Sequence, residues 1–145
     1  MKTTRTYWNP MDNDFRNEWE DIEFSDGNLQ QITIAEDKIS GDYTRLTKFK
    51  AGYSTESFGA KSHTYPEEIF VISGRLYDKA FEKCLKPGFY ASRPSGEVHG
   101  PFIAETDAVI LEKSYPSQTI GKCDIKEETT RQCGRIRKSI FSVLV

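Results

Sequence analysis

Histidine is scarce in this chain, which has only His63 and His99 among 145 residues. Cysteine is nearly as rare: three residues at unrelated spacings exclude a disulfide framework and a thiolate metal cage, and predict reduced thiols in a cytoplasmic protein. No apolar run approaches the roughly 20 residues that span a bilayer, and no apolar stretch follows the basic N-terminus, so we expect neither membrane contact nor a signal peptide. A net charge of -2 lacks the basic excess of a nucleic-acid-binding protein.

What the chain does have is the composition of an ordinary globular domain, with 37% hydrophobic and 29% charged residues. Its length suits one domain with a single core. The residue composition changes twice along the sequence, which predicts three parts. They are a polar N-terminal arm over 1–28 with a helical turn near 15–19, a folded barrel over 29–116, and a C-terminal tail over 117–145 that is helical or disordered.

Short β-branched and aromatic runs, separated by Gly, Pro and Asp, fill the middle of the chain and predict an all-β domain. About eight short strands with tight connections suit a closed barrel or a sandwich. The predicted strands are 30–35, 44–50, 61–65, 69–73, 75–80, 89–92, 98–102 and 108–114.

One segment carries a specific motif: Gly88, Pro94, Gly96 and His99 follow the spacing G-x5-P-x-G-x2-H. The glycine permits a turn into a strand, and Pro94-Ser-Gly96 forms a second tight turn before the next one. That second turn determines where the His99 imidazole enters the fold. The spacing is that of the second sequence motif of the cupin superfamily, which this segment resembles, although the usual closing Asn is Ile103 here.

The first cupin motif, G-x5-H-x-H-x3-4-E-x6-G, is matched in part upstream. Counting back from Gly74 places its glutamate at Glu67 and its second histidine at His63. Lys61 then stands where the family has its first histidine, and Thr55 replaces the leading glycine. An alternative register, with His63 as the first histidine, leaves the glutamate too close, and we prefer the Lys61 register.

The resemblance covers about residues 44–114 and implies an all-β, single-domain cupin fold, a double-stranded β-helix or jelly-roll barrel. The amino-acid sequence around Glu67 resembles that of the cupin branch that contains acetylacetone-cleaving dioxygenases and the cupin half of zinc-binding anti-sigma factors. Self-association is also expected, since cupins commonly form homodimers by pairing sheet edges, which removes exposed edges.

A metal site formed by His63, Glu67 and His99 requires the chain to bend. In a straight strand, His63 and Glu67 would share a face about 13 Å apart, too far for one ion. Pro66 supplies a bend, because proline fixes its own φ and biases its predecessor to an extended shape. Two imidazoles and one carboxylate favour non-haem Fe(II), with Mn(II), Ni(II) or Zn(II) as further candidates for the divalent cofactor.

Lys61 is the departure from the family pattern, and alternation along a strand places it on the same face as His63. Four interpretations are open. The ammonium is neutralised by burial and the metal, swings away to bind an anionic substrate, pairs with Glu67 in a metal-free pocket, or faces solvent. Weaker candidates for substrate binding lie in or beside the motif strands or on an earlier strand: Tyr65, Tyr90, Arg93 and Phe102, and Arg45 and Tyr43.

Three functions remain open from the sequence. The first is a metal-dependent, dioxygenase-like enzyme acting on a small organic molecule, with open metal positions for oxygen or substrate. The second is a non-catalytic cupin that binds or senses a small molecule, which the loss of the first motif histidine favours. The third is a structural protein with a vestigial pocket. The fold does not choose among them.

Overall fold

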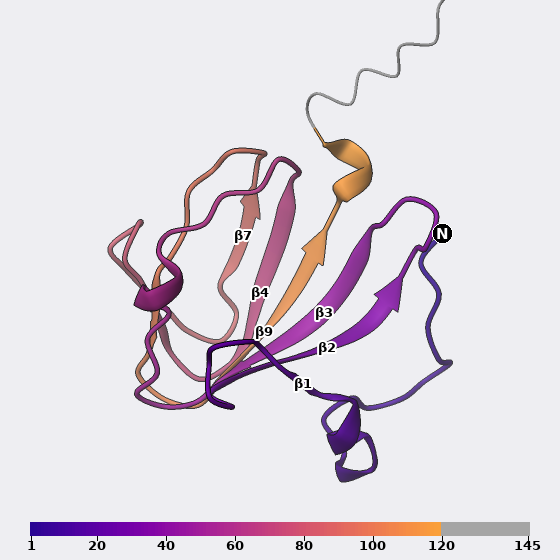
Figure 1. The fold of residues 1–145 in the computed structure, drawn as a ribbon, viewed down its shortest axis with the longest axis horizontal. Helices are drawn as coiled ribbons and strands as arrows, with labels where there is room; N and C mark the ends of the chain where they lie inside the picture. Colours follow the sequence, from indigo (N-terminus) through magenta and orange to yellow (C-terminus); the bar gives the residue numbers. More distant parts are fainter. Residues whose placement is uncertain (120–145) are drawn as a thin grey trace, which may run out of the picture.

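The computed structural model of the chain describes residues 1–119 and forms two antiparallel sheets (Figure 1). The larger sheet has six strands in the order β1-β2-β3-β9-β4-β7, and the smaller has the order β6-β5-β8. The strands are β1 (Glu20–Asp21), β2 (Leu29–Glu36), β3 (Tyr43–Phe49), β4 (Glu67–Ser73), β5 (Leu76–Asp78), β6 (Lys83–Leu85), β7 (Tyr90–Arg93), β8 (Phe102–Ala104) and β9 (Ala108–Ser114). Short 3₁₀ turns occur at Asn13–Glu18, Glu56–Phe58 and Pro116–Gln118.

The inner face of the large sheet packs on the small sheet to form the main core. Its buried members come from strands of both sheets, which is the jelly-roll arrangement expected from the sequence. Alternation along each strand explains their spacing, since every second residue points inward. The cluster consists of Leu29, Phe49, Val71, Leu76, Ala104, Ala108 and Ile110.

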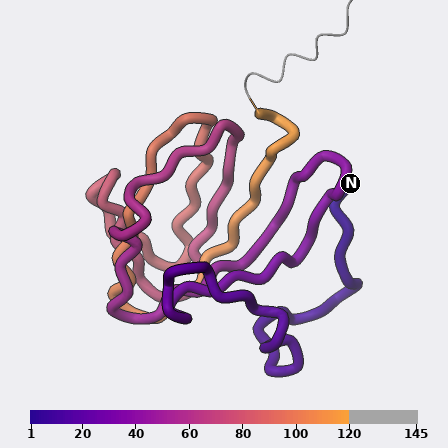
Figure 2. The backbone as a smooth tube through the Cα atoms, viewed as in Figure 1, coloured from indigo at the N-terminus to yellow at the C-terminus, as the bar shows by residue number. Residues whose placement is uncertain are grey.

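The N-terminal arm covers part of the outer face of the large sheet. Figure 2 shows its indigo trace running beside β2, and Thr3 forms a bridge to Glu36 at the end of that strand. Trp19 is buried against Ile32 and Leu46 in a second cluster. The predicted arm therefore contributes a tryptophan to a core, and its last part adds the edge strand β1.

Two strand predictions fail near prolines. Residues 61–65 form no strand, and Lys61 makes only an isolated bridge with His99. The strand predicted over 98–102 begins at Phe102. Pro66 directly follows the first segment and Pro101 lies inside the second, and proline has no N–H to donate to a ladder.

Local sequence patterns missed two short strands, β1 and β6. β6 consists of Lys83, Cys84 and Leu85, a run without β-branched or aromatic residues, and it forms by pairing with β5. The Cys84 thiol is free and half-buried. Most of the predicted C-terminal tail lies outside the described residues. Across residues 1–119, no helix has the length and apolar character to cross a membrane.

Candidate metal centre

Glu67 lies at the centre of the site, as the first residue of β4. It pairs in register with Arg93 of β7 and Ser114 of β9, so strands flank it on both sides. Its inward-facing side chain leaves it only 2% exposed. A buried carboxylate of this kind needs partners that replace the water it has lost.

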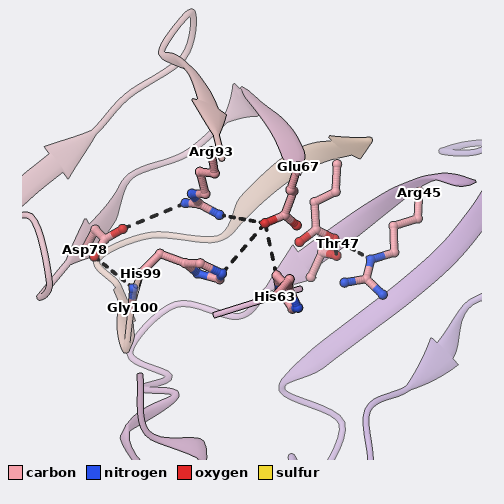
Figure 3. A network of polar contacts seen from close by, with 9 residues as sticks. Arg45, Thr47, His63, Glu67, Asp78, Arg93, His99 and Gly100 are labelled. Atoms are coloured by element: carbon pink, nitrogen blue, oxygen red, sulfur yellow. Dashed lines mark hydrogen bonds and ion pairs between the residues drawn. The ribbon is translucent and has the colours of Figure 1, made fainter. Parts of the chain in front are cut away.

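Both histidines approach Glu67 through the same oxygen. The Nε2 of His99 lies 3.7 Å and the Nε2 of His63 3.9 Å from Glu67 Oε2 (Figure 3). One donor atom from each of the three residues falls within 4.8 Å of the others. The bend at Pro66 thus brings His63 and Glu67 together, which a straight strand would hold about 13 Å apart.

The turn at Pro94–Gly96 ties the two motif segments to each other. The Gly96 N–H donates to the His63 carbonyl over 2.7 Å, with Gly96 at a φ of +86° that glycine adopts without strain. Lys61 and His99 exchange backbone hydrogen bonds of 2.9 Å in both directions. These contacts place His63 and His99 on adjacent segments, with their ring centroids 5.4 Å apart.

Asp78 was not predicted from the sequence, and Arg93 was predicted only as a weaker candidate for substrate binding. The Nη1 of Arg93 donates to Glu67 Oε2 over 3.2 Å, and its Nη2 lies 3.9 Å from Asp78 Oδ2. Figure 3 shows the guanidinium between the two carboxylates. Asp78, which is 2% exposed, also accepts from the backbone N–H of Gly100, next to His99. The Arg93–Asp78 pair thus links the Glu67 carboxylate to the chain segment that carries His99.

Burial shapes the protonation of the centre. It lowers the pKa of His99 to about 3, with the nearby charges of Arg93 and His63 acting in the same direction. Burial likewise raises the pKa of Glu67, and Glu112 adds to this effect, whereas Arg93 and His63 oppose it. His99 is therefore neutral near pH 7, the form in which an imidazole can bind a metal.

The His99 ring supplies the test of whether a metal fits here. The side chain is 8% exposed, and neither ring nitrogen has a hydrogen-bond partner among the described residues. Buried polar atoms are nearly always satisfied, and an orphaned pair of nitrogens requires an explanation. A divalent ion bound by the Nε2 atoms of His99 and His63 and by Glu67 would satisfy one of them. The donor set therefore fits a metal.

A second buried carboxylate lies next to the centre on β9. Glu112 Oε2 accepts from Arg45 Nε and from Thr47 Oγ1, each over 2.6 Å. Arg45 also donates to Gln31. Arg45, which the sequence predicted as a substrate contact, is thus held in place by Glu112.

The remaining predicted residues divide between the centre and the surface. The Tyr65 ring stacks on His63 with centroids 5.1 Å apart, and burial raises the pKa of its phenol. Phe102 lies 5.9 Å from His99, centroid to centroid. Tyr90 lies away from the centre: its phenol donates to Glu68 and is 58% exposed. Alternation along β7 explains this, because Arg93 faces inward and Tyr90, three residues earlier, faces outward.

Lys61 is exposed, and its ammonium lies 5.8 Å from the centroid of the Phe58 ring. Within residues 1–119, the ion-pair partners of Glu67 are Arg93, His63 and His99. The structure therefore shows no Lys61–Glu67 pair in the described part of the chain. Of the four interpretations, the geometry agrees with those that direct the ammonium away from the centre.

The centre opens to solvent at His63. A cavity of about 260 Å³ lies there, lined by Ser62, His63, Thr64, Ser95 and Gly96. Its walls come from the two motif loops. Of the three candidate metal ligands, His63 belongs to this lining.

Comparisons with known proteins place these features in context. The sequence model of the ChrR cupin-like domain family matches residues 16–118, well over half of the chain. No curated protein matches.

Solved structures with the same fold are distant in sequence. KdgF from Halomonas sp. is 20% identical, with 68% of this chain and 84% of that chain covered at a TM-score of 0.56. An acetylacetone dioxygenase from Acinetobacter johnsonii is 16% identical, with coverage of 78% and 76% and a TM-score of 0.60. The Rhodobacter sphaeroides complex of SigE with the anti-sigma factor ChrR is 17% identical, with coverage of 66% and 48% and a TM-score of 0.52. At these identities the likeness concerns the fold alone.

Proposed function

The chain belongs to the family of ChrR cupin-like domains, and on that premise we propose that it is a mononuclear metal protein that acts on a small organic molecule. The observation that carries the proposal is the buried His99 ring, whose Nε2 has no hydrogen-bond partner within residues 1–119 and lies 3.7 Å from Glu67 Oε2. His63, Glu67 and His99 would hold the ion. Two imidazoles and a carboxylate favour iron, with Mn, Ni and Zn as alternatives.

A bound divalent ion would act as a Lewis acid on an oxygen-bearing substrate. The chain's own residues determine how a substrate approaches. The mouth at Ser62 and Ser95 admits it beside His63. Tyr65 covers one face of the His63 ring and keeps that imidazole in place. Phe102, near the His99 ring, contributes an apolar wall that excludes water.

For the reaction, we propose oxygen-dependent cleavage of a diketone-like compound. This rests on the similarity of the fold to the acetylacetone dioxygenase from Acinetobacter johnsonii and on the iron-type donor set. Oxygen uptake by the iron-loaded protein with acetylacetone and related diketones tests it. No uptake over the protein-free rate would rule out this reaction and leave metal binding intact.

Metal analysis tests the metal centre itself, on protein purified without chelators or nickel affinity. We expect about one equivalent of a divalent metal in the natural chain and less than about a tenth of that in His99→Ala, which removes a ligand. Glu67→Gln should also lose the metal. Its matched control is Glu68→Gln, one residue along β4, where the carboxylate instead accepts from Tyr90 and Tyr115. Equal metal content in all four proteins would contradict the assignment.

A second candidate is a metal-free module that binds or senses a small molecule. The Arg93–Glu67 contact favours it, because a guanidinium already occupies the oxygen that faces both histidines. This function predicts a protein without stoichiometric metal that still binds a ligand at the mouth.

We also propose a cytoplasmic homodimer. The odd number of cysteines supports the compartment. The exposed edges of β1 and β7 at either end of the large sheet offer strands for pairing between copies. Sedimentation equilibrium should give twice the chain mass, and a monomer would refute the dimer.

A further inference from the structure

A groove opens in the barrel wall between β7, the edge of the large sheet, and β6, the edge of the small one. Its volume is about 280 Å³, and it lies apart from the mouth at His63, sharing none of its lining residues. Both strands bordering it are edges, so no ladder closes the wall there. We call it the seam groove; its walls include Ile69, Val71, Leu85, Phe89 and Ala91.

The seam groove reaches the inner face of the large sheet. Ile69 and Val71 of β4 are 3% and 0% exposed and belong to its lining. Ala91 pairs in register with Ile69, and therefore shares its inward face. A methyl group at position 91 leaves room where a larger side chain would fill the groove.

Two buried charged residues, Arg93 and Asp78, also line the groove. They are 5% and 2% exposed. The terminal nitrogens of Arg93 face Glu67 and Asp78, but its Nε has no hydrogen-bond partner among the described residues. A buried unpaired donor is costly, and a ligand with an acceptor oxygen would satisfy it after a small shift of the side chain.

The charges select the kind of ligand. Arg93 already faces two carboxylates, Glu67 and Asp78, so a ligand carboxylate would add a third negative charge to this buried cluster. Lys83 and Glu97, of opposite sign, also belong to the lining. The aliphatic and aromatic walls favour an apolar body. A molecule on the order of ten non-hydrogen atoms suits this volume.

We propose that the seam groove is a second small-molecule site, which takes an uncharged aromatic or branched aliphatic compound and binds its carbonyl oxygen at Arg93. The site stands on its own geometry and does not require a metal at Glu67. It gives the barrel a second opening, whose lining residues are separate from those of the mouth at His63.

Fluorine NMR with 4-fluoroacetophenone as the probe tests the site. We expect saturable binding with a Kd on the order of 1 mM, as suits ten atoms, and at least about tenfold weaker binding of 4-fluorobenzoate, which has the same ring with a carboxylate. Ala91→Phe should weaken ketone binding at least about tenfold by filling the groove. Its matched control is Thr33→Phe, which adds the same ring at an exposed position of β2 outside the groove lining and should bind as the natural chain does.

Two further variants keep the outcome decisive. Phe89→Ala removes an apolar wall without adding bulk, and should weaken binding several-fold if Ala91→Phe does not fold. His99→Ala, which removes a metal ligand, should bind the ketone unchanged. Absence of saturable binding, equal loss in Thr33→Phe, or loss in His99→Ala would overturn the proposal. Loss of ketone binding in His99→Ala would place the ketone at the metal centre. A failure of the protein to bind metal would leave the seam groove proposal unaffected.

Discussion

Replacing Arg93 with Met tests how the buried charges of the centre depend on one another. The guanidinium is the nearest fixed positive charge to both Glu67 and Asp78, which are each 2% exposed. Removing one partner of a buried ion pair costs about 3–5 kcal/mol, because the remaining charge stays desolvated. In a chain of this length, where 1 kcal/mol shifts the Tm by about 3–4 °C, we expect Arg93→Met to unfold about 10–20 °C below the natural protein.

The loss should depend on pH with a definite sign. Burial already raises the folded-state pKa of Glu67 above its ordinary value, and Arg93 opposes that rise. Without Arg93 the pKa rises further, so the folded carboxyl holds a proton that the unfolded one releases. A group with a raised folded pKa stabilises the fold below its unfolded pKa and loses that contribution as the pH rises through the folded value. The destabilisation by Arg93→Met should therefore be larger at pH 8 than at pH 5.

Added metal should restore part of the stability, because a divalent ion supplies the positive charge that Glu67 has lost. A ligand at 100 times its Kd stabilises by about 2.7 kcal/mol. Thermal unfolding with and without Fe(II) or Zn(II) measures this. The double variant Arg93→Met/Asp78→Asn is the control: it removes one stranded charge and keeps an acceptor for the Gly100 N–H, so its Tm should lie between the other two. A single variant within 2 °C (about 0.5 kcal/mol) of the natural Tm at pH 8 would refute this account of the buried pair.

Three smaller perturbations test other parts of the fold and site. Gly74→Ala should destabilise by about 3 kcal/mol in urea unfolding, since Gly74 has a φ of +78° and a Cβ there would overlap the Asp107 carbonyl; a loss below 1 kcal/mol would contradict the close approach. Lys61→Ala should change metal affinity, measured by competition with a chromophoric chelator, by less than about threefold, because the side chain is exposed; a tenfold change in either direction would return Lys61 to the centre. Thr47→Val should cost about 1–2 kcal/mol by removing a hydrogen bond to the Glu112 carboxylate, and an unchanged Tm would show that Arg45 alone satisfies it.

Local patterns were enough to predict most of the strands. β9 has the bounds predicted for it, and β2, β3 and β4 differ from their predictions by one or two residues at an end. These strands alternate or carry β-branched and aromatic runs, which are properties of a few neighbouring residues. β6 was not predicted because its three residues have little strand preference. It forms a strand by pairing with β5, which the local sequence of β6 does not reveal.

For the site, the sequence by itself determined which residues have ligand chemistry and where the chain turns: His99 after the Pro94–Gly96 turn, and Glu67 after the bend at Pro66. Only the tertiary structure decided what surrounds them. The role of Arg93 depends on Asp78, and the position of Lys61 depends on its bridge with His99, and both are relations across the fold. Spacing along a chain sets local turns and strand faces, whereas the environment of a buried charge is set by groups that meet only when the barrel closes.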